Sequence, residues 1–98
     1  MIHVGLYYRV KKGKETEFEK IYYEVLKYLK ENVEGFLDAK LYKNVQDPLE
    51  YLIYTEWRDL DSFRKFVTSK AFKDTTTYGK QEILEGTPRN KIFQEINI

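Results

Sequence analysis

The order in which hydrophobic patterns follow one another is the feature that most constrains the fold of this chain. Four segments alternate apolar and polar residues at every second position, as β-strands do: residues 2–10, 36–44, 50–57 and 91–98. Three segments show the three- and four-residue spacing of helices with one apolar face: residues 16–33, 60–67 and about 70–78. The order βαββαβ predicts a ferredoxin-like α+β fold, with the helices on one face of a four-stranded antiparallel sheet.

Residues that favour helix ends and turns mark the boundaries of these elements. Thr16–Glu19, with the sequence TEFE, has the form of a capping box at the start of the first helix. Gly35 is expected to end that helix in a left-handed conformation, and Asp59 and Ser69 stand where helix N-caps belong. The segment 44–50 predicts a turn between the second and third strands. The 98 residues are expected to form one domain, 1–98.

Strand alternation predicts one sheet face that the helices cannot cover. His3, Gly5, Tyr7 and Arg9 are expected on that face, together with aromatic and aliphatic residues of the neighbouring strands. In the second strand, Phe36, Asp38, Lys40 and Tyr42 are expected to share one face, opposite Leu37, Ala39 and Leu41. So apolar a face favours a second copy of the chain packed against it, and we expect a homodimer.

Composition and charge argue against several other classes of function. RNA-recognition modules of the same topology stack bases on aromatic residues, but the third strand here carries Glu50 and Glu56 and no glycine. The formal net charge is +1, from 17 Lys and Arg against 16 Asp and Glu, which provides no field for nucleic acid or anionic membrane. No cysteine is present, and no apolar run has the length of a membrane span. A cytoplasmic protein is therefore expected.

Two stretches show a resemblance to a known family. Residues 8–22, YRVKKGKETEFEKIY, and residues 34–72, from EGF through DP and EW to SKAF, are similar to the first helix region and the central signature of that family. The chain resembles antibiotic-biosynthesis-monooxygenase-like domains of the dimeric α+β barrel superfamily. The resemblance implies a dimer whose sheets form a shared barrel. The superfamily includes monooxygenases that act on polyketides and quinols, and it also includes haem-degrading enzymes.

Three positions test whether this chain carries the residues of the haem-degrading branch of the superfamily. That branch carries an asparagine in the first strand, a tryptophan in the second helix and, some ten residues later, a histidine that binds haem iron. The corresponding positions here are Leu6, Phe66 and Thr76. None of these side chains is a usual axial ligand of haem iron, so haem degradation by that mechanism is disfavoured, and no cofactor is expected.

The resemblance and the strand pattern together nominate a site between the sheet and the second helix. The residues expected to line it are Leu6, Tyr8, Trp57, Phe66 and Thr76, and Arg9 and His3 are the candidates for a catalytic polar group. Trp57, the single tryptophan, either fills the gap between strand end and helix or forms the wall of a pocket. With one histidine and no cysteine, no metal site is expected.

The expected function is that of a cofactor-independent monooxygenase acting on a small aromatic or quinone-like molecule. Such an enzyme needs an apolar cavity in which a few polar groups hold a phenol-like substrate and stabilise its anion. The alternative is a non-catalytic protein of the same architecture, which binds a small molecule or serves in a stress response.

Overall fold

Four strands form one antiparallel sheet in the order β2-β3-β1-β4 in the computed structural model, which describes residues 1–97. The strands are β1 (Ile2–Arg9), β2 (Phe36–Lys43), β3 (Glu50–Trp57) and β4 (Arg89–Gln94). The helices are α1 (Glu15–Asn32), α2 (Leu60–Val67), α3 (Lys70–Tyr78) and the π-helical turn η1 (Gly79–Ile83). This topology confirms the predicted ferredoxin-like α+β fold.

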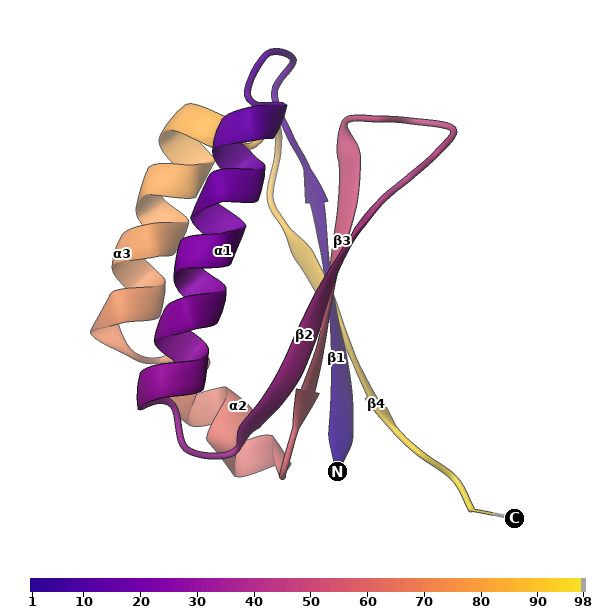
Figure 1. Cartoon of the computed structure of the whole chain (residues 1–98), viewed down its shortest axis with the longest axis vertical. Helices are drawn as coiled ribbons and strands as arrows, with labels where there is room; N and C mark the ends of the chain where they lie inside the picture. Colours follow the sequence, from indigo (N-terminus) through magenta and orange to yellow (C-terminus); the bar gives the residue numbers. More distant parts are fainter. Residues whose placement is uncertain (98) are drawn as a thin grey trace.

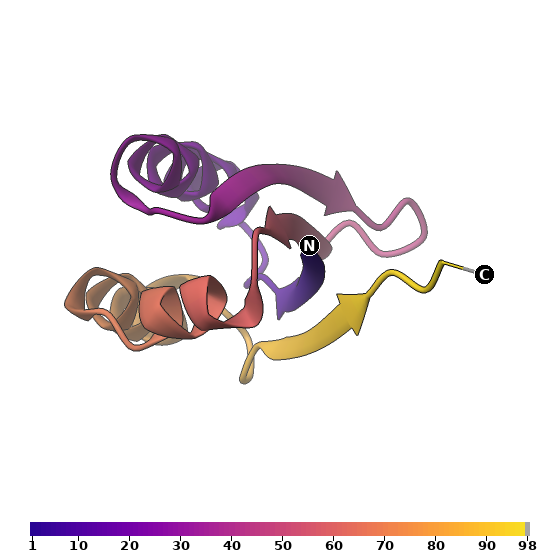
Figure 2. The same cartoon turned by 90° about the horizontal axis from the view of Figure 1, so that it is seen from below.

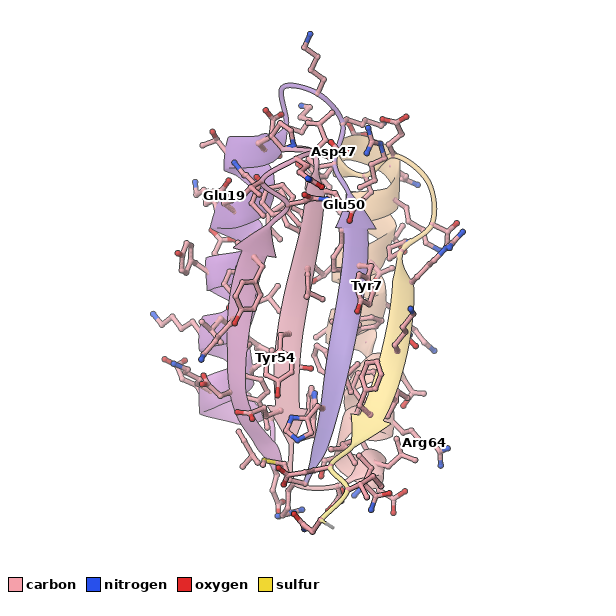
Figure 3. The ribbon with its side chains drawn as sticks, turned by 90° about the vertical axis from the view of Figure 1, so that its right-hand side faces the viewer. Tyr7, Glu19, Asp47, Glu50, Tyr54 and Arg64 are labelled. Atoms are coloured by element: carbon pink, nitrogen blue, oxygen red, sulfur yellow. The ribbon has the colours of Figure 1, made fainter. Side chains whose placement is uncertain are left out.

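The helices lie in one layer against a single face of the sheet. α1 and α3 run side by side on the left of Figure 1, with the sheet on the right. The view from below shows that α1 stands over the β2 side and that α2 and α3 stand over the β4 side (Figure 2). The opposite sheet face has no helix against it, and the labelled Tyr7 and Tyr54 lie on it (Figure 3).

The expected alternation of β2 is wrong at its start. A bulge between Phe36 and Asp38 shifts the register against β3. Phe36 pairs with Trp57 and its ring packs against the indole at 5.4 Å, whereas Asp38 pairs with Glu56 on the uncovered face. One extra residue in a strand reverses the face of the side chains before it, so Phe36 does not share a face with Asp38.

Three element boundaries also differ from the predictions. α1 begins at Glu15 without a side-chain cap on its first turn, and the Glu15 carboxylate accepts the backbone N–H of Gly13 at 2.6 Å, so Thr16 makes no capping box. Helical structure continues beyond Tyr78 into η1, where the N–H of Leu84 donates to the carbonyl of Gly79. The last strand begins at Arg89 and ends at Gln94 rather than spanning 91–98; Ile98 lies outside the described residues.

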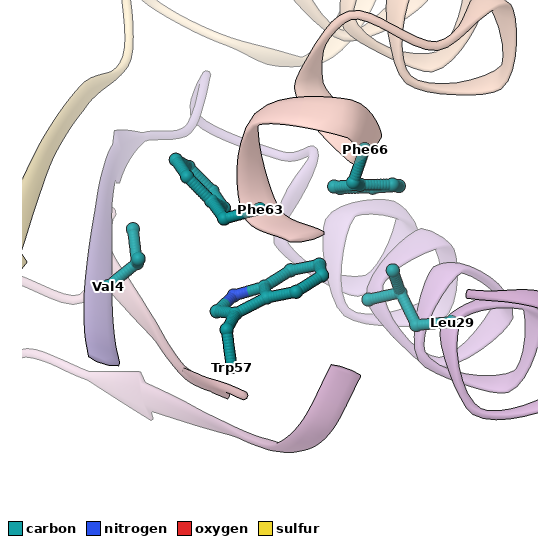
Figure 4. Packing of buried hydrophobic residues seen from close by; sticks show 5 residues of the cluster. All are labelled: Val4, Leu29, Trp57, Phe63 and Phe66. Atoms are coloured by element: carbon teal, nitrogen blue, oxygen red, sulfur yellow. The ribbon is translucent and has the colours of Figure 1, made fainter. Parts of the chain in front are cut away.

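Two aromatic clusters form the core between sheet and helices. The lower one holds Val4, Leu29, Trp57, Phe63 and Phe66, which converge from β1, α1, β3 and α2 (Figure 4). The upper one holds Val10, Phe18, Tyr51, Ile83 and Leu84. The predicted apolar stripe of α1 supplies Phe18 and Leu29, one to each cluster. The side chains of the two clusters do not fill the space between them, and a cavity lies there.

Gly35 allows α2 to lie directly against the turn that leads into β2. Its φ of +87° is left-handed, as expected for a helix terminator, and a Cβ atom there would lie 2.1 Å from Ser62 Oγ. Ser62 cannot move away easily, because its N–H and Oγ both donate to Asp59 Oδ1 at 2.8 Å. These bonds cap α2, and they are the leading cause that lowers the pKa of Asp59 to about 2.

Replacing Gly35 with alanine should therefore lower the free energy of unfolding by about 3 kcal/mol, from the left-handed backbone and the collision with Ser62. Gly13 is the matched control, since its φ is +89° and a Cβ there would have no atom within 4 Å. Gly13→Ala should cost only about 1 kcal/mol. Urea unfolding followed by tryptophan fluorescence measures both values, and equal losses would contradict the close approach.

Candidate ligand-binding cavity

A cavity of about 610 Å³ lies between the helix layer and the sheet. β1 and β3 provide its floor, α1 provides one wall, and α2, α3 and η1 provide the facing wall. Apolar and aromatic side chains make up most of the lining: Leu6, Phe18, Ile21, Val25, Leu29, Ile53, Trp57, Phe63, Phe66, Phe72, Ile83 and Leu84. A cavity of this size and character suits a small, largely apolar molecule.

All five residues predicted to line a pocket contribute to this cavity: Leu6, Tyr8, Trp57, Phe66 and Thr76. Leu6 and Tyr8 reach it because β1 turns its even-numbered residues toward the helices. The three positions that correspond to the haem-degrading branch, Leu6, Phe66 and Thr76, therefore lie around one space. Whether any of these side chains contacts a ligand remains a prediction.

His3 and Arg9, the candidates for a catalytic polar group, point to the other face of the sheet. His3 Nδ1 is hydrogen-bonded to the hydroxyl of Tyr54 and lies 3.6 Å from Glu56 Oε2. Arg9 donates to Asp47 at 2.6 Å, and this hydrogen bond is the leading cause that lowers the pKa of Asp47. Neither residue lines the cavity, because odd-numbered positions of β1 face away from the helices.

Trp57 is a fixed wall of the cavity rather than a polar contact. Its side chain is 1% exposed, and its ring stacks on Phe66 and meets Phe63 edge-on. The indole N–H donates to Thr55 Oγ1 at 2.9 Å, and Thr55 in turn donates to the carbonyl of Val4 at 3.0 Å. Both functions expected from the sequence, filling the corner and bordering a pocket, are met by the same ring.

Tyr8 brings a hydroxyl to the cavity that no residue of the described chain engages. Its ring packs at 5.4 Å from Phe18 and belongs to the edge of the upper cluster. Every fully buried polar side-chain atom among residues 1–97 has a partner, so the unpaired Tyr8 hydroxyl must be accessible, and the space it borders is the cavity. Burial raises the pKa of Tyr8 to about 12, which keeps the hydroxyl protonated at neutral pH.

The rim of the cavity contains polar residues that the sequence analysis did not single out. They are Glu24 of α1, Asp74 and Thr75 of α3, Lys80 of η1, and Asn90 of β4. Asn90 lies at the cavity because it is paired with Leu6 in the sheet register. Only the pairing of β4 with β1 reveals this position, since a six-residue strand at the sheet edge has no distinctive pattern of its own.

α3 covers the cavity without burying any of its own residues. Its contacts with the rest of the chain include the ring of Phe72, which meets Phe66 edge-on at 5.0 Å, and the Tyr78 hydroxyl, which donates to Glu17 Oε1 of α1 at 2.6 Å. Within residues 1–97, no group of three or more metal-binding side chains is found, and no helix is both long and apolar enough to cross a membrane.

Comparison with known proteins assigns this fold and cavity to a class. The family described as "Antibiotic biosynthesis monooxygenase" matches residues 1–78. SnoaB, a cofactor-independent oxygenase from Streptomyces nogalater, superposes with a TM-score of 0.83 at 18% identity, over 99% of this chain and 94% of that one. At this identity the superposition establishes the fold alone. The chain belongs to the antibiotic biosynthesis monooxygenase family.

Two curated relatives have names that refer to haem. A proposed haem-binding protein of Natronomonas pharaonis is 32% identical over 87 residues, which are 89% of this chain and 14% of that protein. A heme-degrading monooxygenase of Halalkalibacterium halodurans is 35% identical over 71 residues, which are 69% of this chain and 60% of that protein. The chain thus spans a small part of the first relative and just over half of the second.

The cavity does not fit a haem held by histidine. His3 is the only histidine of the sequence, and it lies on the opposite face of the sheet. The chain has no cysteine, and Met1, its single methionine, does not line the cavity. Of the usual axial ligands, tyrosine is present, but a phenol such as Tyr8 with a pKa raised to about 12 is poorly disposed to bind iron as a phenolate.

The ionisation of Tyr8 can be measured directly. In protein labelled with ¹³C at the tyrosine Cζ, the Tyr8 resonance should shift only near pH 12, and it should be absent from Tyr8→Phe. Because the folded pKa lies above the unfolded value of about 10, Tyr8 opposes unfolding fully below pH 10, and this contribution is lost as the pH rises toward 12. A midpoint for Tyr8 near pH 10 would show that its hydroxyl is not buried.

Proposed function

We propose that the protein is a cofactor-independent monooxygenase that acts on a small aromatic or quinone-like molecule in the cavity beside Trp57. The observation that carries the proposal is a largely apolar space of about 610 Å³ whose lining includes the unpaired hydroxyl of Tyr8, in a chain of the antibiotic biosynthesis monooxygenase family. SnoaB, which shares the fold, is a cofactor-independent oxygenase. As expected from the sequence, we place the protein in the cytoplasm.

The reaction we propose uses the substrate itself as the electron donor. A phenol anion gives electrons to O₂, and a new carbon–oxygen bond forms on the ring. Loss of water then converts that carbon to a carbonyl, so that phenol + O₂ yields quinone + H₂O. One oxygen atom enters the product, the other leaves as water, and the four electrons that reduce O₂ all come from the substrate. No further reductant is required.

The residues of the chain would serve this reaction by binding rather than by proton transfer. Trp57 and Phe66 stack on each other and form a fixed aromatic wall, beside which a flat molecule can pack. The low-dielectric lining strengthens any hydrogen bond made to the substrate anion. With its raised pKa, Tyr8 cannot remove a proton at neutral pH, so the substrate would enter already ionised or lose its proton to water.

The alternative is a non-catalytic protein that binds the same class of molecule. Because His3 and Arg9 point to the other sheet face, β1 brings no histidine or arginine into the cavity, and Arg89 of β4, which does line it, is exposed. The absence of a buried basic side chain from the lining within residues 1–97 favours this alternative. Binding without turnover would identify it.

Oxygen uptake with a panel of hydroquinones and polyphenols distinguishes the two functions. Under ¹⁸O₂, a monooxygenase should place one labelled atom in the product. Leu6→Phe, which fills the floor of the cavity, should lower kcat/KM by roughly tenfold, whereas Leu37→Phe, on an exposed position of β2 outside the cavity, should leave it unchanged. Uptake that is absent, or equal in both variants, would contradict turnover in this cavity.

We also propose that the uncovered sheet face binds a second copy of the chain. Its side chains include Tyr7, Leu52 and Tyr54, as well as Tyr42 and Phe93, which are 49% and 53% exposed. The hairpin between β2 and β3 and the C-terminal segment both project beyond this face (Figure 2). A sheet face with this many partly exposed aromatic side chains is well suited to packing against an identical sheet.

Sedimentation velocity should show a dimer at micromolar protein concentration. Leu52→Glu places a carboxylate at the centre of the uncovered face and should shift the protein to monomers, because an unpaired buried charge is costly. The control Tyr23→Glu introduces the same charge on α1, in the helix layer on the other side of the sheet, where Tyr23 is 64% exposed, and should remain dimeric. A monomeric native protein would overturn the proposed assembly.

A further inference from the structure

The cavity contains few polar groups that are free to recognise a ligand. Thr55 Oγ1 and Trp57 Nε1 lie deep in the lining, but both are engaged by the hydrogen bonds that run from the indole to the carbonyl of Val4. Asp74 and Lys80 are exposed at the rim, where water competes for them. Two half-buried lining residues, Tyr8 and Thr76, have hydroxyls that make no hydrogen bond within residues 1–97, and the phenol of Tyr8 is the more acidic of the two and therefore the stronger donor.

Two other tyrosines line the cavity and differ from Tyr8 in their surroundings. Tyr22 is buried on α1, where its ring meets Tyr23 edge-on at 5.3 Å, and burial is the leading cause that raises its pKa, followed by Tyr23 and Asp38. Tyr28 is 41% exposed at the rim. Neither places a hydroxyl at the junction of floor and wall, where Tyr8 packs against Phe18 and reaches the space.

We propose that Tyr8 determines the specificity of the cavity by donating its hydroxyl hydrogen to a carbonyl or phenolate oxygen of a flat aromatic ligand. The hydrocarbon part of the ligand would lie against Trp57 and Phe66. This inference rests on the proposed function for the place of the ligand, and it requires no reaction.

The chemistry of the phenol decides which ligands it selects. A protonated phenol in an apolar setting is a strong donor, and it interacts most favourably with an oxygen that carries partial or full negative charge. A ligand without an oxygen leaves the donor unsatisfied, whereas an aromatic cation leaves it unsatisfied and also loses its own hydration. Quinones and ionised phenols are therefore favoured over aromatic hydrocarbons and aromatic amines.

A pair of probes with nearly the same shape isolates this hydrogen bond. Menadione, 2-methyl-1,4-naphthoquinone, has two carbonyl oxygens, and 2-methylnaphthalene has none. Menadione cannot add to a thiol of this chain, because the chain has no cysteine. Equilibrium dialysis measures the affinity of both probes for the native protein, for Tyr8→Phe and for the control Tyr23→Phe, which changes an exposed tyrosine of α1 outside the cavity.

Tyr8→Phe should weaken menadione binding by about tenfold and leave 2-methylnaphthalene binding within about twofold. Tyr23→Phe should leave both affinities within about twofold. An equal loss for both probes in Tyr8→Phe would overturn the inference, because it would reflect altered packing, and so would failure of the native protein to bind menadione. Far-ultraviolet circular dichroism and the urea midpoint verify that each variant is folded.

These measurements are independent of turnover. Selective loss of menadione binding in a protein that consumes no oxygen would support the role of Tyr8 and contradict the monooxygenase. Oxygen consumption that is unaltered in Tyr8→Phe, with unaltered menadione affinity, would overturn the role of Tyr8 and leave the monooxygenase standing.

Discussion

The packing of Trp57 against α2 is the interaction on which the rest of the structure depends. The indole lies at the end of β3, where the chain turns into α2, and it meets Phe63 and Phe66 of that helix and Phe36 of β2. Its N–H is satisfied inside the sheet by Thr55, so the ring can be buried completely. This contact holds the helix layer away from the sheet at its lower end.

The cavity is a consequence of that spacing. The lower cluster packs between the helices and the sheet at one end of the cavity. The upper cluster, which includes Ile83 and Leu84 of the segment after α3, packs at the other end. α3 crosses the space between them and buries no side chain. The large rings at both ends leave a volume between them that side chains do not fill, and the unpaired hydroxyl of Tyr8 borders it.

Strand periods and helical spacing were enough to predict the topology and the uncovered face of β1, because these follow from local periodicity. Leu6, Phe66 and Thr76 were named instead from the family resemblance, and only the structure shows that they border one cavity with Tyr8 and Trp57. The face of Phe36 was not predictable, since a bulge is a property of the pairing between two strands. His3 and Arg9 were named for their chemistry, although the alternation of β1 already directs them away from the helices. The rim residue Asn90 and the π-helical turn depend on contacts between distant segments, which no local pattern encodes.

The amino-acid sequence by itself determined the order of strands and helices, the family, and the absence of cysteine and of any second histidine. These are properties of residue type and spacing along the chain. Only the tertiary structure decided that the Trp57 N–H donates to Thr55, that the Tyr8 hydroxyl makes no hydrogen bond, and that α3 covers a cavity. The physical reason is that hydrogen-bond partners and empty volume arise from segments brought together by folding, and their positions depend on packing rather than on any single segment.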